Sequence, residues 1–467
     1  MYIPTPLRAM RRTLPLFALL LGACAQMPVA EVTMNRGQDS VSGLGQPAMQ
    51  SFPGRAGSAP QYSNAEIAAD MLELQFQMES GRSLPVLSRF EGPISIGLTG
   101  DVPATAPVDL ARVIRRFQTE AGLNVGLAPK GVVPSITMEF VPRSALSKMV
   151  PSAACFVVPR VTSFAEYRAN RAAPDTDWTT VVERKHVAIF APSDTSPQEV
   201  RDCLHEEVAQ AMGPLNDLYR LSDSVFNDDN FHTVLTGFDM LVLRAHNDPA
   251  LHSGMTKAEV AARLPAILAR LNPRGEAIGR MGDLSVTPRA WEAAVGAALG
   301  QRGSPAARKA AAERMLSIAR AQGWQDGRMA FSLFAWARSN VKGDFPASVA
   351  AFRKAGEIYR SLPGGTIQAA HVDMQLAAFA VAQGQSKDAL ALTDRAWPVI
   401  NAAENASLLA TLYMIRAQAL DRLGMRAESR EARLDSLGWA RYGFGSDAQV
   451  RARMNEIAGL AGGAGKG

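Results

Sequence analysis

The sequence has no basic block, no long apolar run and few histidines. Its net charge of +5 comes from basic residues dispersed among acidic ones, without the clustered lysines, arginines and aromatics that bind nucleic acid. We therefore expect no nucleic-acid partner. No apolar run is long enough to cross a membrane as a stable helix. The six histidines include no pair four residues apart, which removes the helical zinc pattern of two histidines on one face.

The remaining composition is that of a globular protein with more than one domain. The chain has 467 residues, of which 47% are hydrophobic and 20% charged, enough for two substantial cores. We expect an α+β domain followed by an all-α part. The expected order is a signal peptide at 1–23, a flexible tether at 24–62, the α+β domain at 63–255, connecting helices at 256–304 and helical repeats at 305–460.

The first residues carry an export signal. Three arginines precede the apolar run 14–21, which is too short to span a bilayer. The run ends in Leu-Gly-Ala before Cys24, which resembles the lipobox of bacterial lipoproteins. The resemblance implies cleavage before Cys24, acylation of this residue and membrane anchoring through its acyl chains. It implies a place in the bacterial cell envelope, facing the periplasm, and Ala25 favours the outer membrane. A plain signal peptide cleaved nearby is the alternative.

The cysteine count fits an oxidising compartment. If Cys24 is acylated, Cys155 and Cys203 remain, and an even remainder in the periplasm predicts one disulfide. Such a bridge stabilises the fold by roughly 3–4 kcal/mol in the loop-entropy account. It would join a predicted strand to a predicted helix. Two buried free thiols are the alternative.

Strand-like and helix-like segments alternate in the first half of the chain. Candidate strands lie at 94–98, 135–141, 155–158 and 187–190, and a candidate helix at 109–121 has apolar residues at helical spacing. Alternating apolar and polar residues in 135–141 indicate a half-buried strand. A small sheet is therefore expected to precede the next helix.

A helix over residues 197–212 has clear start and stop signals. Ser196 suits the N-cap, Pro197 the first helical position and Glu199 the capping-box position. Gly213 and the proline after it end the helix, the glycine supplying a left-handed turn. The helix is expected to bury four apolar residues at helical spacing: Val200, Leu204, Val208 and Ala211.

The sequence from Glu206 to Leu218 resembles the zinc-binding helix and turn of metzincin peptidases, whose pattern is H-E-x-x-H-x-x-G-x-x-H. Glu207 and Gly213 match the glutamate and glycine of that pattern. Glu206, Gln210 and Asn216 stand where the three histidines would be. With the segments 223–228 and 235–243 downstream, residues 63–255 resemble a family of bacterial lipoproteins of unknown function related to zincins. The resemblance implies a peptidase-like fold.

The substituted positions decide the expected chemistry. One carboxylate and two neutral amides form a weak oxygen site, whereas zinc favours imidazole and thiolate. We therefore expect no metal or other cofactor. We expect Glu207 to be the most desolvated carboxylate of the helix, with a raised pKa, as a general base needs. If the domain is active, Glu207 is the catalytic base of a zinc-dependent hydrolase. Glutamates, a glutamine and an asparagine can also be ordinary surface and turn residues.

The last third of the chain contains a weak repeat. Gly343, Gly384 and Gly424 recur at spacings of 41 and 40 residues, with small and apolar residues at related places after them. This resembles tetratricopeptide-type helical hairpins, which bind partners on a concave face. A generic helical-hairpin array is the simpler statement.

These observations give three hypotheses for function. The favoured one is a lipid-anchored envelope protein whose degenerate peptidase-like domain and helical repeats bind a peptide or envelope protein. The second is an active metal-dependent peptidase or hydrolase with Glu207 as its base. The third is a scaffold in which the repeats carry the function and the first domain is a spacer.

Overall fold

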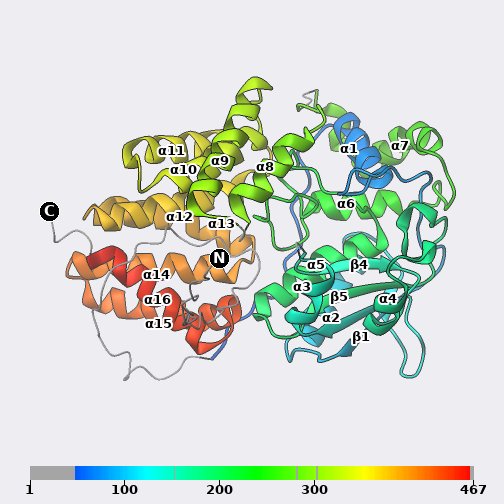
Figure 1. Ribbon diagram of the computed structural model, residues 1–467, viewed down its shortest axis with the longest axis horizontal. Helices are drawn as coiled ribbons and strands as arrows, with labels where there is room; N and C mark the ends of the chain where they lie inside the picture. Colours follow the sequence, from blue (N-terminus) through cyan, green and yellow to red (C-terminus); the bar gives the residue numbers. More distant parts are fainter. Residues whose placement is uncertain (1–47, 152, 280–281, 301–302, 463–467) are drawn as a thin grey trace, which may run out of the picture.

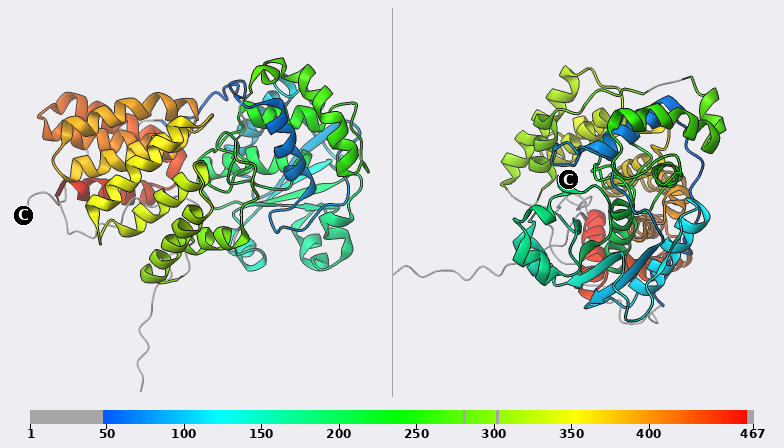
Figure 2. Two further views of the ribbon diagram at one scale, coloured as in Figure 1. Left: turned by 90° about the horizontal axis from the view of Figure 1, so that it is seen from above. Right: turned by 90° about the vertical axis from the view of Figure 1, so that its right-hand side faces the viewer.

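The computed structural model describes residues 48–151, 153–279, 282–300 and 303–462. A part that contains the sheet and a part built from helices lie side by side (Figure 1, Figure 2). The predicted fold class, an α+β domain followed by helices, is confirmed. The expected signal peptide and Cys24 lie outside the described residues. Within the described part of the chain, no helix is both long and apolar enough to span a membrane.

The first part is built on one mixed sheet of five strands in the order β2-β1-β3-β5-β4. Strands β1, β2, β3 and β5 are parallel, and β4 pairs antiparallel with β5 at the edge. The strands are β1 Ile94–Gly100, β2 Val125–Leu127, β3 Ile136–Val141, β4 Phe156–Pro159 and β5 Val187–Pro192.

The expectation of a half-buried strand at 135–141 is wrong, because both faces of β3 are covered. On one face Ile136, Met138 and Phe140 join the main core. On the other face, Val141 joins a second cluster that includes residues of helices α3 and α4. Thr137 is buried as well. A central parallel strand is normally covered on both sides, and here the short helices provide the second cover.

Seven helices of the described residues belong to this part. They are α1 Asn64–Phe76, α2 Ala106–Thr119, α3 Arg143–Met149, α4 Phe164–Asn170, α5 Pro197–Met212, α6 Gly237–His246 and α7 Lys257–Leu271. Helix α7 was expected to be a connecting helix. It instead places Val260, Leu264 and Leu268 in the same core as the sheet, so this core extends past the expected boundary at residue 255.

The helical part consists of consecutive antiparallel hairpins. Helices α9, α11, α13 and α15 begin at residues 305, 345, 386 and 426, which reproduces the 40-residue spacing of the sequence repeat. Gly384 and Gly424 lie in turns with positive φ, which suits glycine. The helices are α8 Arg289–Leu299, α9 Pro305–Ala321, α10 Gly327–Asn340, α11 Phe345–Ser361, α12 Thr366–Ala382, α13 Ser386–Ala402, α14 Ala406–Arg422, α15 Arg426–Phe444 and α16 Asp447–Gly462.

The two parts are joined by buried contacts. Phe231, from the loop before α6, packs edge-on against Phe331, Phe334 and Tyr359 of the helical part. Arg201 of α5 forms a buried ion pair with Glu404, which precedes α14. Elsewhere on the junction, the hydroxyl of Tyr442 in α15 donates to Oδ2 of Asp109 in α2 at 2.8 Å. The helical part is therefore seated on the first domain.

The expectation of a flexible tether is wrong for residues 48–62. Phe52 is buried and its ring stacks on Trp439 at 4.3 Å between centroids. The backbone amide of Arg55 donates to Oε1 of Glu404 at 2.8 Å. Tyr62 is buried in the first core. These residues have apolar and hydrogen-bonding partners in both parts, so this segment is an ordered strap across the junction.

Candidate functional site

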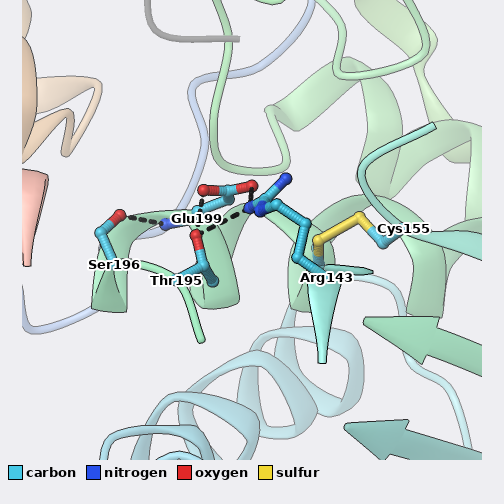
Figure 3. Close-up of a disulfide and its surroundings, with 6 residues drawn as sticks. Arg143, Cys155, Thr195, Ser196 and Glu199 are labelled. Atoms are coloured by element: carbon cyan, nitrogen blue, oxygen red, sulfur yellow. Dashed lines mark hydrogen bonds and ion pairs between the residues drawn. A yellow bond between two sulfur atoms is a disulfide. The ribbon is translucent and has the colours of Figure 1, made fainter. Parts of the chain in front are cut away.

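Helix α5 begins as its sequence predicts. Ser196 is the N-cap, and its hydroxyl accepts a hydrogen bond from the backbone amide of Glu199 at 3.2 Å. The carboxylate of Glu199 does not return to the Ser196 backbone, because it is bound by Arg143 and Thr195 (Figure 3). The four apolar residues expected on the buried stripe are all fully buried: Val200, Leu204, Val208 and Ala211.

The end of α5 at Met212 is as predicted, but the expected reason is wrong. Gly213 has φ −145°, so it does not form a left-handed turn. A Cβ at this position would lie 2.7 Å from Cδ2 of Leu243, so close packing against α6 favours glycine here. The last carbonyls of the helix are satisfied by the buried guanidinium of Arg184, which donates to the oxygens of Gln210, Ala211 and Gly213.

The structure contains the expected disulfide between Cys155 and Cys203, with a Cα–Cα distance of 6.1 Å (Figure 3). Cys155 directly precedes β4, and Cys203 lies in the middle of α5. The bridge therefore attaches the edge of the sheet to the helix that carries the motif.

The three substituted motif positions do not point to a common centre. The side-chain amide of Asn216 donates to the backbone oxygen of Glu73 in α1 at 3.3 Å. The amide of Gln210 points to Oδ2 of Asp217 at 3.5 Å. Glu206 lines a cavity that neither amide reaches. Among the described residues, no group of three or more His, Cys, Asp or Glu side chains is arranged to hold a metal ion.

Glu207 is buried, as expected, with 5% of its surface exposed. Its Oε2 atom has no hydrogen-bond partner. Burial first, and then the nearby charge of Glu79, raise its pKa to about 8. At neutral pH this carboxyl group is therefore mostly protonated, which suits a proton donor better than a general base.

Glu207 belongs to a group of carboxyl side chains around the end of α5. Burial, followed by mutual repulsion, raises the pKa values of Glu206 and Asp217 well above normal. Asp228, from the loop before α6, has its pKa raised to about 7 by the same two causes. Glu79 completes the group, and its pKa is also raised by burial. No local pattern marks Glu79, because more than 120 residues separate it from the motif.

The loop after the motif is held by α6. Thr236 caps this helix and Asp239 completes the capping box, as the sequence indicates. Asp239 also accepts hydrogen bonds from the hydroxyl of Ser224 at 2.5 Å and from the amide of Val225 at 3.2 Å. His205, one residue out of register with the zinc pattern, accepts from the amide of Leu235 through Nδ1. These residues shape the loop rather than gather at a reactive centre.

A cavity of about 380 Å³ lies at the junction of the two parts. Its walls come from α5 and the loop 225–233 on one side, and from α12, α14 and α16 on the other. Gln198, Asp202 and Glu206 line it from α5, and the disulfide borders it. Its volume is in the range of ligand-binding pockets. Of the motif positions, Glu206 lines this cavity, whereas Glu207, Gln210 and Asn216 do not.

The opposite wall of the cavity was not foreseen from sequence. His371 comes from α12 and Arg453 from α16, and Thr233 faces them from the loop before α6, on the α5 side. The Nε2 atom of His371 and the hydroxyl of Thr233 are buried without a hydrogen-bond partner. Arg453 is paired with Glu456. No local pattern marks these residues, since the docking of the helical part brings them to α5.

Comparison with known proteins identifies the first part. Residues 64–266 match the model of a family described as Protein of unknown function (DUF2927). The match includes the sheet and helices α1 to α6, and ends inside α7, before the helical part. Neither the curated proteins nor the solved structures contain a match to the chain. This region is therefore similar to the DUF2927 family, and the comparisons assign no activity to the chain.

Proposed function

We propose that the protein is a lipid-anchored envelope protein that binds a peptide segment of a partner in the cavity between its two parts, without catalysing a reaction. In this proposal Cys24 carries the acyl chains, the outer membrane holds the protein, and the first domain is a degenerate relative of metzincin peptidases. The order of sheet, α5 and C-terminal helices is the order that the resemblance implies.

One observation carries the proposal: α5 presents Glu206 to a junction cavity, while Gln210 and Asn216 are turned to hydrogen bonds within the first domain. A zinc centre needs its ligands to converge on one point. A binding site needs a preformed cavity with polar groups that fix the ligand. The side chains of α5 fit the need of a binding site for a cavity with polar groups, and not the need of a zinc centre for converging ligands.

The test is a selection of short peptides from a displayed library on the full-length chain purified in detergent. Ala452 is exposed on α16 and borders the cavity, so Ala452→Trp should block it without disturbing the core. Ala310→Trp, on the exposed face of α9, is the matched control. We expect selected peptides to bind the wild type and Ala310→Trp equally, and to lose about tenfold or more in affinity for Ala452→Trp. Equal binding to all three proteins would refute the proposal.

An active hydrolase is the second candidate, and the buried, unpartnered carboxyl group of Glu207 favours it. In that case Glu207 and a metal held by neighbouring carboxylates and a histidine would cleave the bound segment. Loss of peptide cleavage in Glu207→Gln, together with stoichiometric zinc in the wild type, would establish this function in place of simple binding.

A scaffold function of the helical part is the third candidate. A second, smaller pocket of about 240 Å³ lies between α13 and α14 and is lined by Trp397 and Tyr413. The indole of Trp397 is 40% exposed and donates to the Tyr413 hydroxyl at 2.8 Å. If Trp397→Ala abolished partner binding and Ala452→Trp did not, the scaffold would be the function.

A further inference from the structure

The junction cavity has an excess of acidic side chains. Asp202 and Glu206 both line it, and neither has a salt-bridge partner among the described residues. Two other lining acids are neutralised, since Glu199 pairs with Arg143 and Glu456 pairs with Arg453. Burial raises the pKa of both carboxyl groups well above normal, and a cation bound beside them would favour their ionised form.

The bases that line the cavity supply no unpaired positive charge. Burial lowers the pKa of His232 to about 4 and that of His371 to about 3, so both imidazoles are neutral at physiological pH. Arg201 lies near Asp202, but its guanidinium is bound by Glu404 across the junction. The charged groups that raise the pKa of Glu206 are all acidic: Glu207, Glu79, Asp228 and Asp202.

The cavity also offers hydrogen-bond acceptors that are not in use. The Thr233 hydroxyl has no partner, and a neutral histidine in the Nδ1-protonated form accepts at Nε2, the unpartnered atom of His371. A primary ammonium group has three donors and no acceptor, so carboxylate, hydroxyl and imidazole acceptors match it. An anion would meet two carboxyl groups and neutral bases, and is disfavoured.

We propose that this cavity binds the primary ammonium group of a flexible chain, with Glu206 as its principal partner and Asp202 as the second. The group is supplied by the side chain of a lysine in a peptide, or by a free linear amine of the same chemistry. The inference rests on the proposed function, because it assigns a ligand class to the cavity that the proposed function uses.

The experiment measures affinity by isothermal titration on the full-length chain in detergent at pH 7.5. Three probes distinguish the source of the ammonium group: the blocked tripeptide acetyl-Ala-Lys-Ala-amide, the same peptide with its lysine side chain acetylated, and cadaverine. We expect the lysine peptide to bind about tenfold or more tightly than its acetylated form. Cadaverine binding as tightly as the lysine peptide would assign a free amine, and weaker cadaverine binding would assign a peptide lysine; either supports ammonium recognition.

Isosteric variants locate the contact. Glu206→Gln should weaken the lysine peptide about tenfold and Asp202→Asn by a smaller factor, with the acetylated peptide unaffected. Glu428 is exposed on α15 outside the cavity, so Glu428→Gln is the matched control and should bind like the wild type. Circular dichroism checks that each variant is folded.

The outcomes separate this inference from the proposed function. The ammonium site is overturned if the lysine peptide and its acetylated form bind equally, or if Glu206→Gln binds the lysine peptide with full affinity. This holds even if the peptides selected from the library still bind Ala452→Trp more weakly than the wild type. Absence of binding by all three probes overturns it in the same way. The proposed function itself is refuted if the library yields no binding peptide, or if the selected peptides bind Ala452→Trp as tightly as the wild type.

Discussion

Helix α5 takes part in two neighbouring regions with opposite properties. Up to Glu206 it faces the junction, where Arg201 is paired across the domains and a cavity lies open beside Asp202. From Glu207 onward it faces the first domain, where buried polar atoms of Glu207 and Asp217 lack partners. The half with Glu207 and Gln210 is closed, whereas the half that ends at Glu206 borders a cavity with room for a ligand.

Resemblance to a known site and a geometry that can bind a ligand therefore need not coincide on one helix. The first region depends on the helical part, since α12, α14 and α16 form most of its far wall. The second depends on contacts inside the first domain. Variants that affect one region and spare the other therefore test the comparison.

The largest expected effect comes from breaking the junction at Arg201. Arg201→Ala leaves Glu404 buried without its counter-charge, which typically destabilises a protein by about 3–5 kcal/mol. Arg430→Ala, at an exposed position of α15, should change stability by less than about 0.5 kcal/mol. Urea unfolding measures both. A loss below about 1 kcal/mol for Arg201→Ala would mean that this contact does not hold the two parts together.

The next effect concerns the disulfide that fixes α5 to the sheet edge. The double variant Cys155→Ser, Cys203→Ser should lose about 2–4 kcal/mol of stability under oxidising conditions. In reducing buffer the wild type should fall to the same stability as the variant. If the wild type and the double variant had the same free energy of unfolding in both buffers, the disulfide would not stabilise the fold.

A pH-dependent effect on stability tests the second region, where Glu207 is buried in the first domain. The pKa of Glu207 is about 8 in the folded chain and 4.5 without burial, so between these values the folded state binds more protons than the unfolded one. The stability that this group contributes is complete below pH 4.5 and is lost as the pH rises through 8. Glu207→Gln should therefore be more stable than wild type at pH 8.5, by roughly 4 kcal/mol, and similar to it, within about 1 kcal/mol, at pH 5.

Melting temperatures of both proteins from pH 5 to pH 9 supply the measurement for Glu207→Gln. Glu428→Gln serves as the control, because this glutamate is exposed and its removal should leave the pH profile unchanged. If the melting temperatures of all three proteins fell in parallel as the pH rises, the Glu207 carboxyl group would not be protonated in the folded chain.

The smallest effect is expected for ligand affinity when the motif amides are removed. Gln210 and Asn216 lie outside the cavity, so Gln210→Ala and Asn216→Ala should change peptide affinity by less than about twofold. Titration with the peptides selected on the wild type checks this. A tenfold loss in either variant would place the ligand at the motif instead of the junction.

The sequence predicted the features that depend on local signals. The start of helix α5 was predicted because Ser196 and Pro197 mark it directly, and its end was predicted at about Met212, where it lies. The pairing of Cys155 with Cys203 followed from the count of cysteines in an oxidising compartment. Strand β2, three residues long, carries too little pattern to be recognised.

What the sequence could not reveal depends on packing between distant segments. Gly213 is favoured by the approach of Leu243, which no local rule predicts. His371 and Thr233 line one cavity because the helical part docks on the first domain, which brings residues about 140 positions apart in the chain to opposite sides of the same space. The ordered strap at 48–62 was missed for the same reason, since its partners lie on both parts.

The most direct test of the central claim, that α5 serves recognition and not zinc chemistry, is a metal count. The full-length chain is purified without chelators from zinc-supplemented medium and analysed by mass spectrometry, beside Gln210→Ala. We predict well below one zinc per chain in both proteins, with peptide binding retained. One zinc per wild-type chain that disappears in Gln210→Ala would contradict the account.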